Sequence, residues 1–431
     1  MHMTKIKRTT VLTAVLVAGS FVSTGCGDVL KVTNPGLIAD AALDDASVFA
    51  ALVTGISADY SVALNLSREI AEMTDDQENS SFQILQWHLG HFEPDLVNPW
   101  WRQMHTARWV AEDGIRRMKG GMAAADFAKS PLVARAQLFA GLSNRLLGEN
   151  VCYAVFDGGK AEPRTEHFKR AEQEFTAAMA TAQAAGASAA SLYTAALGGR
   201  ASVKAWQGNW DGAVADAALV PVGFSYQALY GDNTARENNS YWQGSFGNWY
   251  LSMDKTSWIT VGVDLEKTPR TGDPRIPYKA VRNASGNIII TRSGIHKAIA
   301  QMKYPDLGSD KNVVAGTEML VLRAEAALRK KDIAGMTTLL NANRAYYGMT
   351  PLAVPATEAG AWDTLAYERG ATLWLEGRRF WDLSRWYEEG HAFVVNVQGD
   401  AKETMAKRDR CIPIALAEME SNPSLKGFKG L

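Results

Sequence analysis

The sequence is poor in the residues that mark several large classes of protein. It holds only three cysteines and seven histidines, and its 45 Lys and Arg residues nearly balance its 46 Asp and Glu residues. Binding to nucleic acid needs a basic surface, so a net charge of −1 gives no electrostatic argument for that function. The chain contains no HExxH, GxSxG, P-loop or dinucleotide-binding motif. The sequence therefore predicts no metal site, no cofactor and no recognisable catalytic motif.

The apolar run at the N-terminus is also short. It extends over Val11–Val22 behind the cations Lys5, Lys7 and Arg8, whereas a membrane-spanning helix needs about 20 apolar residues. This arrangement is typical of a secretion signal. The small residues of 23–25 stand directly before Cys26, as in a lipobox. We expect residues 1–25 to be removed as a lipoprotein signal peptide and Cys26 to be lipidated; ordinary signal-peptidase cleavage nearby is the alternative.

The other two cysteines are Cys152 and Cys411. In an exported protein they can form a disulfide, but only if their Cα atoms come within about 7 Å, which the sequence does not establish. We expect two buried thiols, with the disulfide as the alternative.

Helical periodicity dominates the mature chain. A helical pattern over 191–206 is followed by a turn at 207–210 and a second helical pattern over 212–219. A similar pair covers 320–328 and 333–343, and Gly348 stands where its second helix should end. Such helix–turn–helix units, with small residues where the helices cross, predict degenerate tetratricopeptide-like repeats.

Two regions do not follow a helical pattern. Residues 74–99 are polar, and residues 230–290 are rich in Asn, Gly, Ser and aromatic side chains. Loops of this length in a compact protein are usually functional or disordered, and the aromatic content argues against disorder.

Several motifs, in a fixed order, resemble one protein family. The segment 367–386, YERGATLWLEGRRFWDLSRW, is similar to the ERxxEL-x-EGxRxxDLxRW signature of the SusD/RagB family. Further similar segments are Asn98–Trp101, Thr271–Arg275, Lys303–Pro305, Glu318–Ala327, Ile412–Ile414 and Asn422–Pro423. Together they cover the mature chain from about residue 35 to its end.

The resemblance implies a fold and a function. The expected fold is mainly α: a SusD-like, right-handed superhelix of tetratricopeptide-like helix pairs, with long irregular loops and little strand. It would occupy residues 26–431, with an inserted loop region at about 230–290. The expected function is that of a non-catalytic, lipid-anchored outer-membrane protein that faces the cell surface and captures oligosaccharide or peptide. It would deliver this nutrient to a SusC-like TonB-dependent transporter.

The aromatic loops supply the candidate binding residues. Sugars stack their CH faces on aromatic rings while amides and carboxylates bind their hydroxyls. We expect the two loops to meet on one face and Trp87, Trp242 and Trp249 to be exposed there; Trp100 and Trp101 are expected in the core. The full set of candidates is Asp75, Asp76, Trp87, Tyr241, Trp242, Asn248 and Trp249.

Acidic and histidine clusters have simpler interpretations. Asp75 and Asp76 are adjacent, and no partner residue marks them as a glycosidase pair, so a solvated turn or helix cap is the expectation. His88, His91 and His105 have no further ligand pattern and are expected to cap or pack.

The charged aromatic segment is expected to form the structural frame. On a helix, Asp382 lies one turn from Arg385, so the two can pair. We expect Trp381 and Trp386 to be buried, and Arg378 or Arg379 to pair with a carboxylate such as Glu368 or Glu376.

Two other functions remain open from the sequence. One is a helical-repeat scaffold lipoprotein that binds no small ligand, and the other is a secreted glycan hydrolase. Hydrolysis that is lost on replacing Asp75 or Asp76 would support the second.

Overall fold

Helices make up most of the chain. Of its 431 residues, the computed structural model describes 40–79, 87, 89–247, 251–254, 256–258, 273–292, 294, 296–397 and 401–430. The α-helices are α2 (Phe49–Leu64), α3 (Leu66–Ala71), α5 (Asn98–Gly121), α6 (Ala124–Phe127), α7 (Pro131–Asn150), α8 (Thr165–Ala185), α9 (Ala190–Trp206), α10 (Trp210–Ala217), α11 (Ser240–Trp242), α12 (Gly316–Arg329), α13 (Ile333–Tyr346), α14 (Glu358–Thr372), α15 (Arg379–Glu388) and α16 (Leu416–Ser421). Shorter turns are η1 (Asp40–Asp44), η2 (Ala46–Val48), η3 (Gly186–Ala189), η4 (Gln243–Gly247), η5 (Met405–Lys407) and η6 (Pro423–Leu425).

The strands are short and pair two by two. They are β1 (Glu78–Asn79), β2 (Tyr153–Val155), β3 (Ala161–Pro163), β4 (Ser225–Ala228), β5 (Leu251–Ser252), β6 (Tyr278–Ala280), β7 (Ile299–Gln301), β8 (Lys311–Ala315), β9 (Val395–Val397) and β10 (Ala401–Glu403). The pairs are β1 with β5, β2 with β3, β4 with β8, β6 with β7 and β9 with β10, all antiparallel.

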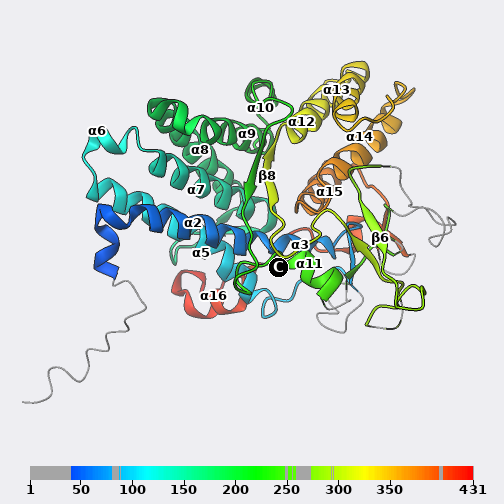
Figure 1. Ribbon diagram of the computed structural model, residues 1–431, viewed down its shortest axis with the longest axis horizontal. Helices are drawn as coiled ribbons and strands as arrows, with labels where there is room; N and C mark the ends of the chain where they lie inside the picture. The colour runs from blue at the N-terminus through cyan, green and yellow to red at the C-terminus, as the bar shows by residue number, and fades with distance from the viewer. Residues whose placement is uncertain are drawn as a thin grey trace, which may run out of the picture.

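Helices that follow one another in the chain pack side by side. Each helix contacts the next in the series α5, α7, α8, α9, α10 and α12, and α12 in turn contacts both α13 and α14. Figure 1 shows the helices from α7 to α14 across the upper part of the molecule, with α5 below α7 and the strand β6 to one side. The predicted fold class, mainly helical with little strand and long loops, is confirmed.

Small residues let neighbouring helices approach closely. The ring of Phe175 in α8 lies between α7 and α9, where a Cβ added at Gly141 or Gly199 would come within 2.7 or 2.5 Å of it. Phe175 is fully buried, so the ring fills the space that the two glycines leave. A larger residue at either glycine would force the helices apart, because packed interiors have no spare volume.

The turns between paired helices lie where the sequence predicts them. Asn209 accepts a hydrogen bond from the backbone N–H of Gly212 and so caps α10, and Asp332 caps α13 in the same way through Gly335. Gly208 and Gly348 follow the ends of α9 and α13 with φ of 81° and 67°. Glycine adopts this left-handed conformation without the Cβ clash that other residues meet.

One stretch of the described residues, Ala46–Ala71, is long and apolar enough to cross a membrane by length and composition. In the structure it comprises η2, α2 and α3, and α2 packs against α5 and α7. Val53, Ile56 and Tyr60 face the core. The apolar residues of this stretch that face the core are therefore explained by packing against α5 and α7.

The segment with the family signature forms α14, a tight turn and α15. Trp381 and Trp386 are 5% and 0% exposed, which confirms their predicted burial. Asp382 accepts hydrogen bonds from Arg385 at 2.7 Å, as predicted from their spacing, and from Arg369 at 2.7 Å. Arg385 also binds Glu325 of α12 at 2.6 Å, so the two arginines are compensated by one carboxylate of the helix pair and one of α12.

The partners predicted for the two adjacent arginines are wrong. Arg378 pairs with Glu149 of α7 at 2.5 Å, and Arg379 binds both carboxylate oxygens of Asp75 at 2.8 and 2.9 Å. Glu368 is bound instead by Arg275 and Arg344, and Glu376 by Lys303. Pairing was predicted correctly, but its partners come from distant segments that local spacing does not reveal.

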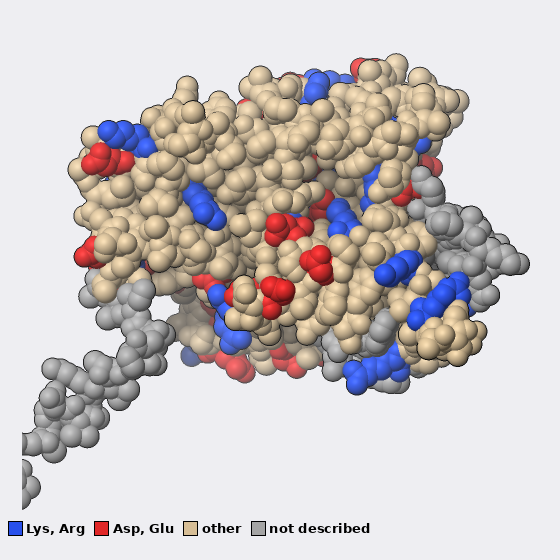
Figure 2. Space-filling view, in the orientation of Figure 1, with Lys and Arg blue, Asp and Glu red and all other residues tan. Residues whose placement is uncertain are grey.

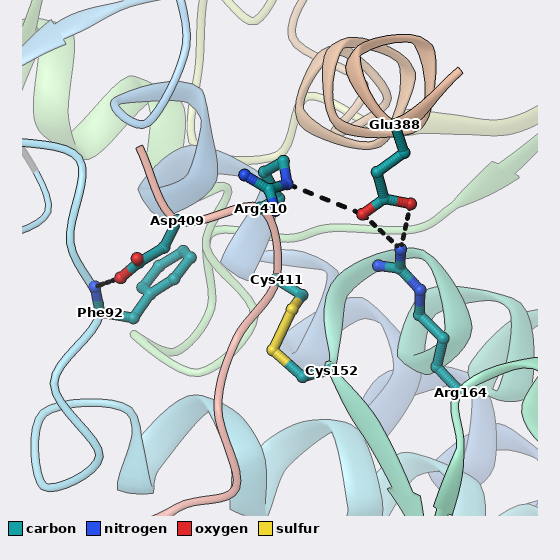
Figure 3. Close-up of a disulfide and its surroundings, with 7 residues drawn as sticks. All are labelled: Phe92, Cys152, Arg164, Glu388, Asp409, Arg410 and Cys411. Carbon is teal, nitrogen blue, oxygen red and sulfur yellow. Dashed lines mark hydrogen bonds and ion pairs between the residues drawn. A yellow bond between two sulfur atoms is a disulfide. The ribbon is translucent and has the colours of Figure 1, made fainter. Parts of the chain in front are cut away.

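Two of the three cysteines in the sequence are joined. Cys152, which follows α7, forms a disulfide with Cys411 near the C-terminus, with Cα atoms 5.0 Å apart (Figure 3). The expectation of two buried thiols is therefore wrong. The backbone N–H of Cys152 also donates to Ile412 O at 2.9 Å, so strand-like pairing brings the two segments within bonding distance. The bond fastens the C-terminal segment to the helical scaffold.

Candidate functional site

The two long loops meet, as the sequence predicts. Glu78 of the first loop pairs with Ser252 of the second in the short sheet of β1 and β5. The side chain of Gln77 donates to Ser245 Oγ at 3.2 Å. We refer to the described residues of this region, 74–79, 240–247, 251–254 and 256–258, as the loop junction.

The loop junction rests on a small apolar core of its own. Tyr241, Met253 and Trp258 from the second loop pack with Trp374 and Leu375, which form the turn between α14 and α15. The signature segment thus holds the loops in place from below. This agrees with its predicted role as frame.

Asp75 and Asp76 lie inside this frame and are each 1% exposed. Asp75 is held by Arg379, and Asp76 Oδ1 accepts a hydrogen bond from Trp258 Nε1 at 3.1 Å. Burial, and then the neighbouring charge of Asp75, raise the pKa of Asp76 to about 7. The expectation of a solvated turn is wrong, and neither carboxylate is presented to a ligand at the surface.

The candidate aromatics divide into buried and half-buried groups. Trp87 is 0% exposed and packs edge-on against Phe92, so the prediction that it is an exposed platform is wrong. Tyr241 is also fully buried, and its hydroxyl donates to Ser67 O at 2.8 Å. Both rings are buried because burial of their large apolar area is favourable.

Among the candidate aromatics that the structure describes, Trp242 is the one that reaches the surface. It is half-buried, and its ring centroid lies 6.2 Å from that of Phe246, one turn further along. Asn248 and Trp249 lie outside the described residues, and so does Cys26. Ligand binding by Trp242, Asn248 and Trp249 stays a prediction.

A cleft of about 540 Å³ opens beside the loop junction. Its walls are α2 and α3, the start of α5 and the second loop. The lining residues mix one large aromatic ring with many polar groups: Asp59, Val62, Asn65, Arg68, Glu69, Trp100, Arg102, Gln103, Thr106, Ala235, Arg236, Ser240 and Gln243. This composition suits a ligand with both apolar faces and hydroxyls.

Hydrogen bonds fix the wall that belongs to the second loop. Asn65 receives a hydrogen bond from Ser240 Oγ at 3.0 Å and donates to Asn238 O at 3.1 Å. Lys311 Nζ also donates to Asn65 Oδ1, at 2.9 Å. Asn65, between α2 and α3, therefore ties α11 to the scaffold and sets the position of Ser240 and Gln243 at the cleft.

Four of the five charged side chains that line the cleft form two ion pairs, and the carboxylate of Glu69 is buried. Arg236 binds Asp59, and Arg68 binds Glu69. Burial raises the pKa of Asp59, while the charge of Arg236 opposes that shift. The Oε1 atom of Gln103 is buried and has no hydrogen-bond partner among the described residues. Such an unpaired acceptor costs free energy until a donor reaches it.

Most of the cleft residues were missed by the sequence analysis. Trp100 was expected in the core; it does pack against the core, but it is half-buried and also lines the cleft. The available signal was the spacing of Trp100, Gln103 and Thr106, which places them along one stripe of α5. A stripe of this mixed composition indicates that this side of α5 faces a surface, but it does not indicate which segments form the other wall of the cleft.

A second cleft and the histidines offer weaker candidates for a functional site. A cleft of about 890 Å³ lies between the loop after α13 and α14, and two of the four charged residues that line it, Arg344 and Glu368, bind each other at 2.6 Å. No cluster of three or more potential metal ligands exists among the described residues. His91 is exposed near Asp409, and burial lowers the pKa of His105 to about 3, consistent with packing.

Comparison with known proteins agrees with this architecture. Residues 312–426, which include α12–α16, match the model of the SusD family. The resemblance to the SusD/RagB family is confirmed. A SusD-like carbohydrate-binding protein from Bacteroides fragilis has a TM-score of 0.65 at 14% identity, covering 89% of this chain and 99% of that one.

Other SusD-like structures are similar over nearly the whole chain. A second SusD-like protein from Bacteroides fragilis has a TM-score of 0.64 at 11% identity, covering 90% of this chain and 97% of that one. A SusD superfamily protein from Bacteroides vulgatus has a TM-score of 0.61 at 13% identity, covering 89% and 98%. At such identities these likenesses concern the fold. No curated protein shows significant similarity to the chain.

Proposed function

We propose that this SusD-like protein is a non-catalytic nutrient-binding lipoprotein that captures an oligosaccharide in the cleft beside the loop junction. The observation that carries the proposal is the meeting of two long loops next to a cleft that Trp100, Arg102, Gln103 and Gln243 line. The carbohydrate-binding description of a structure with the same fold supports a sugar over a peptide.

The chemistry of the cleft suits a polyol. The ring of Trp100 offers an apolar face for sugar CH groups, while Arg102, Gln103 and Gln243 supply donors and acceptors for hydroxyls. Water-filled, partly open clefts of this kind exchange ordered water for ligand hydroxyls with modest affinity. Modest affinity is what a protein needs if it must later release its cargo.

A hydrolase is less well supported. Asp75 and Asp76 are buried in an ion pair and a hydrogen bond, away from the cleft. The carboxylates that do line the cleft are Asp59, which Arg236 binds, and Glu69, which is buried and bound by Arg68. Both are engaged in ion pairs, whereas hydrolysis requires two carboxyl groups free to act on the glycosidic bond. Hydrolysis of an oligosaccharide that is lost on Asp59→Asn or Glu69→Gln would overturn the non-catalytic proposal.

We also propose that Cys26 anchors the protein in the outer membrane and that a SusC-like TonB-dependent barrel receives the ligand. The lipobox-like sequence before Cys26 and the family resemblance support both. Cys26→Ala should release the protein from membranes or leave it as uncleaved precursor, because one apolar run of this length does not hold it there. Equal labelling of variant and wild type by a radioactive fatty acid would contradict the anchor.

Glycan capture is tested by calorimetric titration of the mature protein against a panel of neutral and acidic oligosaccharides, with tryptic peptides as the competing class. Arg102→Ala and Gln243→Ala remove exposed side chains from the cleft and should each weaken binding by about three- to tenfold. Arg116→Ala lies on the same helix α5, is 67% exposed and serves as the matched control. Binding of peptides alone, or equal loss in the control, would contradict the proposal.

A further inference from the structure

A basic arm extends from the molecule beside the loop junction. It consists of β6, β7 and the described residues between them, 281–292, 294 and 296–298, and it exposes Lys279, Arg282, Arg292 and Lys297. The sequence from Ile276 to Gln301 contains no Asp or Glu. In Figure 2 the blue residues on the lower right, over this arm, have no red residue among them.

The carboxylates that lie nearest to the arm do not form ion pairs with its exposed lysines. Asp254 accepts a hydrogen bond from the backbone N–H of Lys297 at 3.0 Å, Glu78 faces His296 at 3.3 Å, and Asp273 binds Arg275 at 2.7 Å. All three are buried. Among the described residues, no carboxylate lies within ion-pair distance of Lys279, Arg292 or Lys297.

An aromatic surface borders the arm. Trp242 and Phe246 are half-buried, with ring planes 30° apart. Lys279 Nζ lies 5.5 Å from the centroid of the Phe246 ring. Ser240 and Gln243 line the cleft, so this short helical segment presents its polar side to the cleft, while Phe246 contacts Lys279 of the arm and Trp242 packs beside Phe246.

We propose that the basic arm and the Trp242–Phe246 pair form a subsite for an acidic glycan, a chain that carries uronic acid carboxylates or sulfate esters. The proposal rests on glycan capture and names the class of glycan. A pyranose ring stacks its CH face on the aromatic pair, and Lys279 is then placed to bind an anionic substituent at the edge of that sugar. Arg292 and Lys297 extend the positive field along the arm for later residues of the chain.

The rings favour a glycan over an anionic membrane surface. Lipid headgroups would be drawn by the cations alone, whereas a half-buried aromatic pair in contact with a lysine matches the alternation of apolar face and charge on an acidic sugar. Nucleic acid is disfavoured by the near-neutral charge of the chain, 45 basic against 46 acidic residues.

The test compares ligands of equal length that differ in charge. Binding of the mature protein to an oligogalacturonide, to a sulfated heparin fragment and to a neutral oligosaccharide is measured by calorimetry at low and high NaCl. The acidic chains should bind about tenfold more tightly than the neutral chain at about 50 mM salt, and the difference should largely disappear at about 500 mM because exposed charges are screened.

Variants assign the effect to the arm. Lys279→Gln with Lys297→Gln should weaken acidic chains by about tenfold and leave a neutral chain unchanged, because exposed charge alone is removed. Lys129→Gln with Lys160→Gln removes two exposed lysines elsewhere, 60% and 77% exposed, and should change nothing. Trp242→Ala should weaken acidic chains without altering their salt dependence.

The other outcomes separate this proposal from glycan capture itself. If neutral chains bind, require Arg102 and are not weaker than acidic ones, capture stands and the acidic subsite is overturned. If no glycan binds but vesicles containing phosphatidylglycerol bind through Lys279 and Lys297, both proposals fail and the arm is a membrane contact. Equal losses in the Lys129 and Lys160 control would also overturn the subsite, because they would show a general charge effect.

Discussion

The helix pair with the family signature and the cleft beside the loop junction use the same side chains for opposite purposes. In the helix pair, Trp386 donates to Glu325, and Arg385 binds both Glu325 and Asp382, all in the interior. In the cleft, Trp100 is half-buried and Arg102 is exposed. Arginine and tryptophan are structural where they are buried beside carboxylates and available for binding where they line the cleft.

This difference has an energetic basis. Removing one member of a buried ionic network leaves the other charge in a medium that solvates it poorly, so the helix pair tolerates little change. Exposed side chains at the cleft exchange water for ligand at small cost, so their replacement should alter affinity more than stability. This distinction would be contradicted if substitutions in the cleft lowered stability, or if substitutions in the helix pair lowered ligand affinity.

The largest expected effect is that of Arg379→Met. The substitution leaves Asp75 buried without its two hydrogen bonds and removes the guanidinium 5.1 Å above the Trp258 ring. We expect a loss of about 3–5 kcal/mol in the free energy of unfolding. Urea denaturation measures this loss, and Arg116→Met on the surface should cost less than about 1 kcal/mol. Equal costs for the two variants would remove the distinction between buried and exposed pairs.

Trp381→Ala tests the apolar side of the same frame. Its ring packs against Phe168 and Trp206, with centroids 5.5 and 5.9 Å away, and beneath Arg164. The cavity left behind should cost about 3–5 kcal/mol. Glycan affinity of the fraction that remains folded should change little. A variant of wild-type stability that no longer binds glycan would place the site in the helix pair instead of the cleft.

The sequence predicts local features of this fold well. Periodicity places the helix pairs, the turn at Gly208 and the end of α13 before Gly348, and spacing alone pairs Asp382 with Arg385. Burial of Trp381 and Trp386 follows from a segment in which aromatic residues alternate with charge. These features depend on residues within a few turns of one another.

Contacts between distant segments were not predictable in the same way. Arg379 and Asp75 are 304 positions apart, and Cys152 and Cys411 are separated by 259. Trp87 is buried because other parts of the same chain cover it, and the sequence of its own loop does not indicate that burial. For the candidate site, the sequence indicated which loops meet but not that α5 supplies the opposite wall.

The disulfide sharpens the comparison by linking the scaffold to the C-terminal segment. Cys152→Ser with Cys411→Ser should lower the free energy of unfolding by about 2–4 kcal/mol, because the unfolded chain regains the freedom of a long closed loop. Glycan affinity should be unchanged, since the cleft beside the loop junction contains neither cysteine. Thermal unfolding of the oxidised and reduced wild type provides the control: reduction should reproduce the effect of the variant, and an effect of reduction on the variant itself would contradict this account.

The smallest expected effect concerns pH and Asp76. Its pKa is raised by burial from 3.8 to about 7, so the folded protein holds a proton that the unfolded chain has already lost. Stability from this group is present below the unfolded pKa and declines as the pH rises toward about 7. Asp76→Asn mimics the protonated form and retains an oxygen that can accept from Trp258 Nε1. The melting temperature of this variant should therefore fall less between pH 5 and 8 than that of the wild type, by about one or two degrees. Asp126→Asn, at an exposed position of α6, should leave the pH dependence as it is. Parallel melting curves for Asp76→Asn and wild type across this range would show that Asp76 is ionised in the fold, and that the frame beneath the loops carries two charges opposite Arg379.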